Sequence, residues 1–243
     1  MLNLLMLLSV LVSPTNAADP SIEDLLNATD DIQRGGSSAA VLQMAVKTSR
    51  YERTVELKAW SKGEDKSLII IESPAKDKGI ATLKVGDNIW NYLPKVDRTM
   101  KVPGGMMSSS WMGSHFSNDD LVKQNRLADE FTAVIEARPT AGTGSWVLRL
   151  TPKPDAPVVW GAIVVTVSAD IIPESIQYFD EDGSLARTMR FESVQDVGGR
   201  KVPMVMTLIP ASKPDEQTKV TYTSLEFDVE LQDSIFSLQG LKQ

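Results

Sequence analysis

Apolar and polar side chains alternate with a period of two over most of the chain after residue 38. The alternation is clearest in residues 42–47 and 55–60, where it predicts two long antiparallel strands joined by a turn over residues 48–53. Residues 68–71 are apolar without interruption, so we expect a strand there that is covered on both faces. Alternating or apolar runs continue to residue 227, and together they predict about ten or eleven strands.

Short helical signals flank and interrupt this strand pattern. Residues 21–24 read Ser-Ile-Glu-Asp, which resembles a capping box and predicts the start of a helix. Residues 117–120 read Ser-Asn-Asp-Asp and predict the cap of a second, shorter helix. Near the end of the chain, residues 233–236 are expected to form a single turn that docks on the sheet edge. The apolar stripe of the first helix is expected to consist of Ile22, Leu25, Leu26 and Ile32.

These elements predict a mainly β protein of the α+β type. Long strands in a meander curl into a barrel or half-barrel, because strands twist. We expect one domain over residues 18–243, since β barrels and sandwiches of this length are commonly single units. An apolar concave face combined with an apolar insertion would enclose a hydrophobic cavity. The pattern leaves open whether that cavity is empty or is a filled core.

The apolar insertion is the stretch between residues 104 and 116. Its apolar side chains are separated only by glycine, serine and the single histidine of the chain, His115. A solvated loop would be polar, so we interpret this stretch as a lid that covers an apolar surface. The residues predicted to line the lid or to bind lipid are Trp90, Tyr92, Leu93, Met106, Met107, Trp111, Met112, Phe116, Met204 and Met206.

Methionine makes this assignment ambiguous. Thioether side chains are flexible and polarisable, which suits acyl chains of different shape, but methionine fills protein cores equally well. Gly104, Gly105 and Gly113 would allow the lid to hinge.

The amino-terminal segment predicts export. Residues 2–12 are apolar apart from Asn3 and Ser9, and a small residue follows at Ala17, so residues 1–17 are interpreted as a signal peptide cleaved after Ala17 or Ala18. No lysine or arginine precedes the apolar run, which departs from the usual pattern. The chain has no cysteine, so it has neither disulfides nor a lipid-modified cysteine, and we expect a soluble protein without a membrane span after cleavage.

Charge and side-chain chemistry narrow the functional classes. The formal net charge of -7 argues against a nucleic-acid partner and against adhesion to anionic lipid by charge alone, so lipid contact is expected through apolar surface. His115 lies beside several serines and near Asp119 and Asp120, which superficially resembles a hydrolase. However, no Gly-x-Ser-x-Gly motif is present, and a lone histidine with two capping aspartates lacks metal-ligand spacing. We therefore expect no catalytic residues, no metal and no cofactor.

Several longer motifs carry a family resemblance. Residues 84–98 read KVGDNIWNYLPKVDR, residues 110–114 read SWMGS, and residues 116–121 read FSNDDL. Later blocks are DGSLARTM at residues 182–189, the run through VGGRKVP at residues 197–203, and FSLQGL at residues 236–241. Together they resemble the outer-membrane lipoprotein-sorting proteins, the LolA-like superfamily, over nearly all of the chain after the signal peptide.

The resemblance implies an incomplete antiparallel β-barrel whose hydrophobic cavity is closed by helices. It further implies a periplasmic carrier that binds acyl chains of lipoproteins or lipids for transfer toward the outer membrane. A transporter of the resistance-nodulation-division (RND) type in the inner membrane is the implied partner. An alternative is a non-enzymatic periplasmic adaptor of such an exporter, in which the same fold has a filled core. The sequence does not separate these two.

Overall fold

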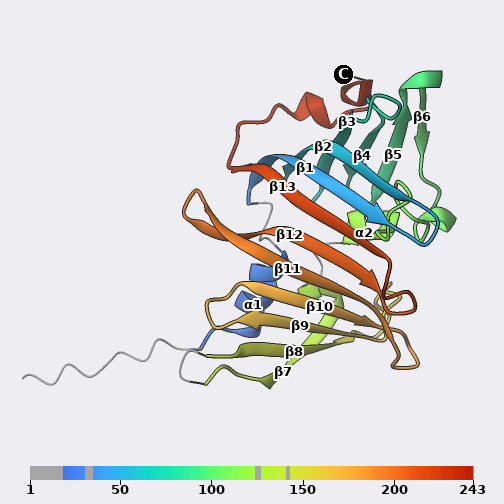
Figure 1. The fold of residues 1–243 in the computed structure, drawn as a ribbon. Coiled ribbons are helices and arrows are strands. Elements are labelled where there is room, and N and C mark those ends of the chain that lie inside the picture. Colours follow the sequence, from blue (N-terminus) through green and yellow to red (C-terminus); the bar gives the residue numbers. More distant parts are fainter. Residues whose placement is uncertain (1–18, 31–34, 124–126, 141–142, 243) are drawn as a thin grey trace, which may run out of the picture.

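The computed structural model describes residues 19–30, 35–123, 127–140 and 143–242, and within them thirteen strands form one antiparallel sheet (Figure 1). The predicted signal peptide, residues 1–17, lies outside the described residues. The strands are β1 (Ser37–Lys47), β2 (Glu52–Lys62), β3 (Lys66–Ser73), β4 (Ala81–Val85), β5 (Asn88–Leu93), β6 (Arg98–Lys101), β7 (Phe131–Ala137), β8 (Ser145–Pro152), β9 (Ala162–Ser168), β10 (Pro173–Phe179), β11 (Leu185–Val197), β12 (Arg200–Pro210) and β13 (Gln217–Phe227).

The sheet is open. The strand order is β6-β5-β4-β3-β2-β1-β13-β12-β11-β10-β9-β8-β7, so the chain starts at the centre, reaches one edge at β6, crosses to the other edge at β7 and returns. The first and last strands pair antiparallel in the middle, from Ser38 opposite Phe227 to Lys47 opposite Gln217. The two edge strands do not pair with each other, so the prediction of a mainly β, unclosed antiparallel sheet is confirmed.

The sheet holds more strands than the ten or eleven predicted. One strand that the pattern does not reveal is β6, which reads Arg-Thr-Met-Lys and has mostly exposed side chains. A lone edge strand without an apolar face gives no periodic signal, and β6 is defined instead by its backbone pairing with β5.

The predicted first helix is confirmed as α1 (Ile22–Asp30), which lies against one face of the sheet (Figure 1). The Ser21 hydroxyl accepts a hydrogen bond from the Asp24 N–H at 3.0 Å, and the Asp24 carboxylate accepts one from the Ser21 N–H at 2.9 Å. This reciprocal cap satisfies amide groups that have no partner inside the helix. Leu25 and Leu26 are buried, whereas Ile32 lies outside the described residues.

The connection between the two edges carries the other helices, α2 (Asn118–Lys123) and α3 (Leu127–Glu130). The predicted cap of α2 is confirmed, because the Asp120 N–H donates to the Ser117 hydroxyl at 3.1 Å and the Asp120 carboxylate accepts from the Ser117 N–H at 2.7 Å. Before α2, η2 (Gly104–Met106) is a single 3-10 turn. No described helix is long and apolar enough to cross a membrane.

Two hydrophobic clusters lie on opposite faces of the sheet. The larger one contains Ile71 with Ile69 against it, while Leu68 belongs to the smaller one with Ile70 against it. The uninterrupted apolar strand is therefore covered on both faces, as predicted. The smaller cluster is covered by the C-terminal turns η3 (Asp233–Phe236) and η4 (Gly240–Lys242).

The prediction that the C-terminal turn docks on the sheet edge is wrong. Turn η3 contacts β3 and β4, which are interior strands. Phe236 and Leu241 are buried there because they pack on the apolar side chains of these strands and remove them from water.

Candidate functional site

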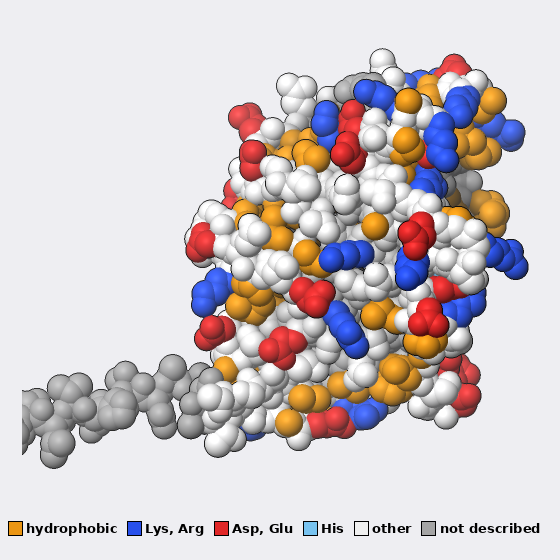
Figure 2. Space-filling model, in the orientation of Figure 1, with side chains coloured by type: hydrophobic (Ala, Val, Ile, Leu, Met, Phe, Trp, Pro, Cys, Tyr) orange, Lys and Arg blue, Asp and Glu red, His pale blue; other side chains and the backbone are white. Residues whose placement is uncertain are grey.

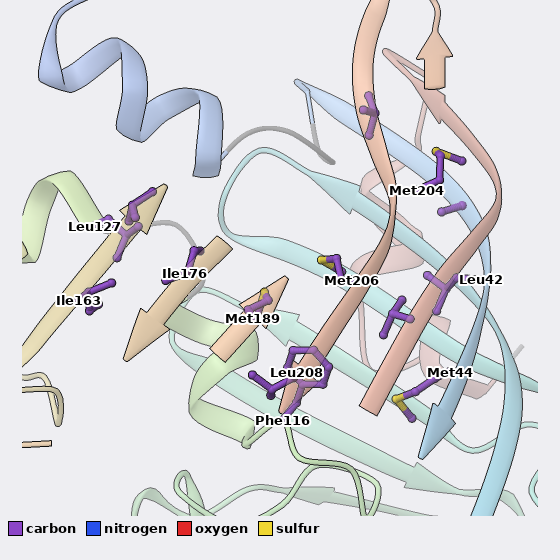
Figure 3. Close-up of a cluster of buried hydrophobic side chains, with 14 of the residues drawn as sticks. Leu42, Met44, Phe116, Leu127, Ile163, Ile176, Met189, Met204, Met206 and Leu208 are labelled. Atoms are coloured by element: carbon purple, nitrogen blue, oxygen red, sulfur yellow. The ribbon is translucent and has the colours of Figure 1, made fainter. Parts of the chain in front are cut away.

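A cavity lies between the helices and the face of the sheet that carries the larger hydrophobic cluster. Its volume is about 200 Å³. Strands from both halves of the sheet contribute to it, and Figure 3 shows the row of buried side chains that runs along this face, including Ile163, Ile176, Met189 and Met206. The remaining hydrophobic residues that line it are Ala40, Ala59, Trp60, Ile69, Phe116, Leu121, Leu127, Phe131, Val158, Val159, Trp160, Tyr178, Phe191 and Tyr222.

Charge is distributed unevenly around the cavity. The charged side chains that line it are all acids, and each belongs to a helix: Asp30 in α1, Asp119 and Asp120 in α2, and Glu130 in α3. The sheet contributes apolar and hydroxyl side chains instead. The wall formed by the sheet therefore suits an apolar molecule, while polar groups lie on the side of the helices.

An ion pair between Asp120 and Arg187 joins α2 to β11 beside the cavity. The two side chains are 17 % and 11 % exposed, and the Arg187 Nη1 donates to the Asp120 Oδ2 at 2.8 Å while Nη2 donates to Oδ1. Burial alone would raise the pKa of Asp120, but the hydrogen bonds and charge of Arg187 and the bonds from Ser117 outweigh it, so the pKa is lowered. The carboxylate is thus charged and holds α2 against the sheet.

Two aromatic rings enclose the guanidinium of this pair. The Arg187 Cζ lies 4.6 Å from the centroid of the Trp160 ring and 4.4 Å from that of Tyr178, within cation–π range. The two rings lie 5.1 Å apart between centroids, and both line the cavity. Burial raises the pKa of the Tyr178 hydroxyl to about 12, so this residue stays neutral.

Two of the ten predicted lid or lipid-binding residues, Phe116 and Met206, line this cavity. Trp111 and Met204 are buried in the larger hydrophobic cluster without lining the cavity, and Met112 packs against that cluster. Trp90 and Tyr92 pack against the smaller cluster on the opposite face. Leu93 and Met107 are half-buried outside the cavity lining, and Met106 is 54 % exposed.

The second half of the predicted lid is fixed by polar bonds to the sheet. The Trp111 indole N–H donates to the Thr82 hydroxyl at 3.1 Å, and the Arg53 Nη1 donates to the Met112 carbonyl at 3.2 Å. The Tyr51 hydroxyl also donates to the Gly113 carbonyl. Residues 111–113 are therefore part of the folded body in this structure.

The single histidine is also held by the sheet. His115 Nδ1 lies 2.8 Å from the Thr218 hydroxyl and Nε2 lies 3.3 Å from a Glu216 carboxylate oxygen. The hydrogen bond from the Ser49 N–H to Glu216, with those from His115 and the charge of Lys213, outweighs burial and lowers the pKa of Glu216 to about 2. The order hydroxyl, imidazole, carboxylate resembles a hydrolytic triad, but Thr218 is 0 % exposed, so a substrate has no access to its hydroxyl.

The described residues hold no group of three or more histidine, aspartate or glutamate side chains placed to bind a metal ion. The apolar cavity, lined by side chains of the helices and of the sheet, is the candidate site. Sequence reasoning missed Trp160, Tyr178 and Arg187, although Arg187 lies in one of the family-like motifs.

A family model described as "Uncharacterized protein" matches residues 63–243. No match is found among the curated proteins. Solved structures share the fold, among them the following three. A DUF1329 family protein from Desulfovibrio piger has a TM-score of 0.80 at 23 % identity, covering 90 % of this chain and 96 % of that one.

The second is a domain named for outer membrane lipoprotein sorting from Vibrio parahaemolyticus, with a TM-score of 0.76 at 21 % identity over 90 % of this chain and 97 % of that one. The third is a LolA superfamily protein from Nitrosomonas europaea, with a TM-score of 0.72 at 21 % identity over 90 % and 98 %. The chain therefore belongs to the family whose model covers residues 63–243, and its fold is that of the LolA superfamily and DUF1329 structures.

Proposed function

We propose that this protein is a periplasmic carrier that binds acyl chains of lipoproteins or lipids and moves them toward the outer membrane without covalent chemistry. The observation that carries the proposal is the cavity of about 200 Å³ whose sheet wall is mainly apolar. The likeness to a lipoprotein-sorting domain and a LolA superfamily protein supports it at the level of the fold.

The volume of the cavity limits the length of acyl chain that fits in this structure. An engineered cavity of about 150 Å³ in another protein binds benzene, so about 200 Å³ takes only a short stretch of an acyl chain. Burying about ten methylene groups would contribute roughly 8 kcal/mol, which corresponds to about micromolar affinity before ordering costs. A longer chain therefore requires the helices to move away from the sheet.

The helices are suited to such a movement. Helix α2 is joined to β11 through side chains, whereas the strands are joined by continuous backbone ladders. The attachment of α2 is the Asp120–Arg187 pair, and Phe116, just before α2, lines the cavity. We propose that α2 is the lid and that this pair holds it closed.

Uptake of a fluorescent fatty acid tests the proposal. Ala59 lines the cavity from β2, so Ala59→Trp should place an indole in that space and weaken uptake at least tenfold. Ala45→Trp is the matched control, because Ala45 alternates with the buried Met44 and Val46 and faces the other side of the sheet. Equal uptake by folded Ala59→Trp and wild-type protein would contradict the proposal.

The alternative, an adaptor of an RND-type exporter in the inner membrane, is favoured by the small cavity volume alone. It predicts that folded wild-type protein takes up no fatty acid and instead co-purifies with a crosslinked inner-membrane exporter. The carrier proposal predicts saturable uptake whether or not an exporter is present.

A further inference from the structure

The edge of the sheet at β6 exposes hydrophobic side chains that no described element covers. Strand β6 is flanked by η1 (Pro94–Val96) and η2 (Gly104–Met106), and we call residues 95–106 the β6 edge. Val96 is 66 % exposed, Met100 37 % and Met106 54 %. Three large hydrophobic side chains exposed within one short segment indicate an interaction surface.

Basic side chains alternate with these hydrophobic ones. Lys95, Arg98 and Lys101 are exposed, and in the described part of the chain none of them lies within ion-pair distance of a carboxylate. The segment has one acid, Asp97, which is already paired with Lys242 at 2.7 Å. The β6 edge is therefore positive, although the formal net charge of the whole chain is -7.

The space-filling view agrees with this composition. Figure 2 shows hydrophobic and basic side chains gathered at the upper right of the molecule, where Figure 1 places β6. The Gly104–Gly105 pair that leads to Met106 has open space around both α-carbons.

Hydrophobic tips interleaved with lysine and arginine fit a lipid bilayer with anionic headgroups. The cations interact with phosphates, and the apolar side chains enter the boundary between headgroups and acyl chains. Strand addition by a peptide or a second copy fits less well, because basic residues on a four-residue edge strand discourage pairing. We propose that the β6 edge docks this protein reversibly on the anionic surface of a bilayer.

This inference does not rest on the proposed function, since a protein with a filled cavity would present the same edge. Vesicle flotation tests it, with wild-type protein and variants exported and purified in the same way. The probes are vesicles of phosphatidylcholine alone and vesicles in which about one lipid in three is phosphatidylglycerol. Each basic residue near such a surface contributes about fivefold, so the triple variant Lys95→Gln/Arg98→Gln/Lys101→Gln should bind the anionic vesicles on the order of a hundredfold more weakly.

Two further variants separate the apolar contribution from charge. Met106→Ser should weaken binding to anionic vesicles several-fold, whereas Val134→Ser, at a residue 55 % exposed on β7 at the far edge, should leave it unchanged. The charge control is Lys47→Gln/Arg190→Gln/Lys219→Gln, which removes three exposed basic residues from other strands.

Loss of vesicle binding in the β6-edge variants alone is the result that we expect, with fatty-acid uptake retained by the variant Lys95→Gln/Arg98→Gln/Lys101→Gln, whose three residues lie outside the proposed lid. Failure of the wild-type protein to float with anionic vesicles would overturn the proposal. Equal loss in the charge control would overturn it as well, because binding would then follow overall charge. Self-association that depends on Met106 without vesicle binding would replace the bilayer by a second copy of the chain.

Discussion

Removing either side chain of the Asp120–Arg187 pair should destabilise the protein strongly. Arg187→Met leaves a carboxylate that is 17 % exposed with only the bonds from Ser117, and Asp120→Asn leaves a guanidinium that is 11 % exposed without its counter-charge. Breaking a buried ion pair by removing one partner typically costs about 3–5 kcal/mol. We expect about 3 kcal/mol for each variant, because Ser117 and the aromatic rings retain part of the stabilisation.

The double variant Asp120→Asn/Arg187→Met should cost clearly less than the sum of the two single variants, because it leaves no unpaired buried charge. We expect a coupling free energy of about 2 kcal/mol or more, since removing both partners of a buried pair is often close to neutral. Urea unfolding followed by tryptophan fluorescence measures all four proteins. Lys201→Met is the control, because its pair with Asp170 joins side chains that are 61 % and 70 % exposed and should contribute less than about 1 kcal/mol.

The same variants report on closure of the proposed lid. If the pair holds α2 against the sheet, Arg187→Met should release a bound fluorescent fatty acid faster than wild-type protein. Free energies of unfolding within about 1 kcal/mol of wild type for both single variants would refute the reasoning, because the pair would then be equivalent to a surface ion pair.

Three further variants test other parts of the structure. Met206→Ala should lower the free energy of unfolding by about 2–5 kcal/mol, because it leaves a hole in the buried core. The same variant should enlarge the cavity and therefore bind a longer fatty acid than Met206→Leu binds. An identical chain-length preference of the two variants would contradict this expectation. Glu216→Gln should flatten the pH dependence of stability. The pKa of Glu216 is about 2 in the folded protein instead of 4.5, so the carboxylate stabilises the fold above pH 4.5 and this stabilisation is lost as the pH falls toward 2. Urea unfolding midpoints measured across this pH range test the prediction, and an unchanged pH dependence would contradict it. Gly161→Ala should destabilise the protein by about 1–3 kcal/mol, since a Cβ would lie 2.6 Å from the Asp180 carbonyl oxygen, whereas Gly105→Ala has open space and should be tolerated in thermal unfolding.

Local elements could be predicted from the sequence because their causes are local. The caps at Ser21 and Ser117 involve residues three apart, and both form as expected. Strand character follows from alternation within one segment, and the buried strand at residues 68–71 is covered on both faces. Strand β6 was missed because its identity depends on pairing with β5 at the edge and not on its own apolar pattern.

The candidate site could be predicted only in part, because it is assembled by topology. Trp160, Tyr178 and Arg187 meet Asp120 from distant parts of the chain, and no spacing rule links them. The apolar character of the stretch from residue 104 to 116 was visible in the sequence. However, periodicity does not determine that Phe116 lines the cavity while other members pack elsewhere.

Net charge also conceals local chemistry. A value of -7 argues against adhesion to anionic lipid by charge alone, yet the acids lie partly on the helices around the cavity and the β6 edge is basic. Sequence order does not show how charges are distributed over a folded surface, so the docking inference required the structure.

The central claim is that the cavity holds an acyl chain. Native mass spectrometry of the protein purified without detergent tests this most directly, with Ala59→Trp and Ala45→Trp measured alongside it. We expect an adduct with the mass of a lipid or an acylated peptide on the wild-type protein and on Ala45→Trp, and its loss from Ala59→Trp. An adduct-free wild-type protein that also takes up no added fatty acid would contradict the account.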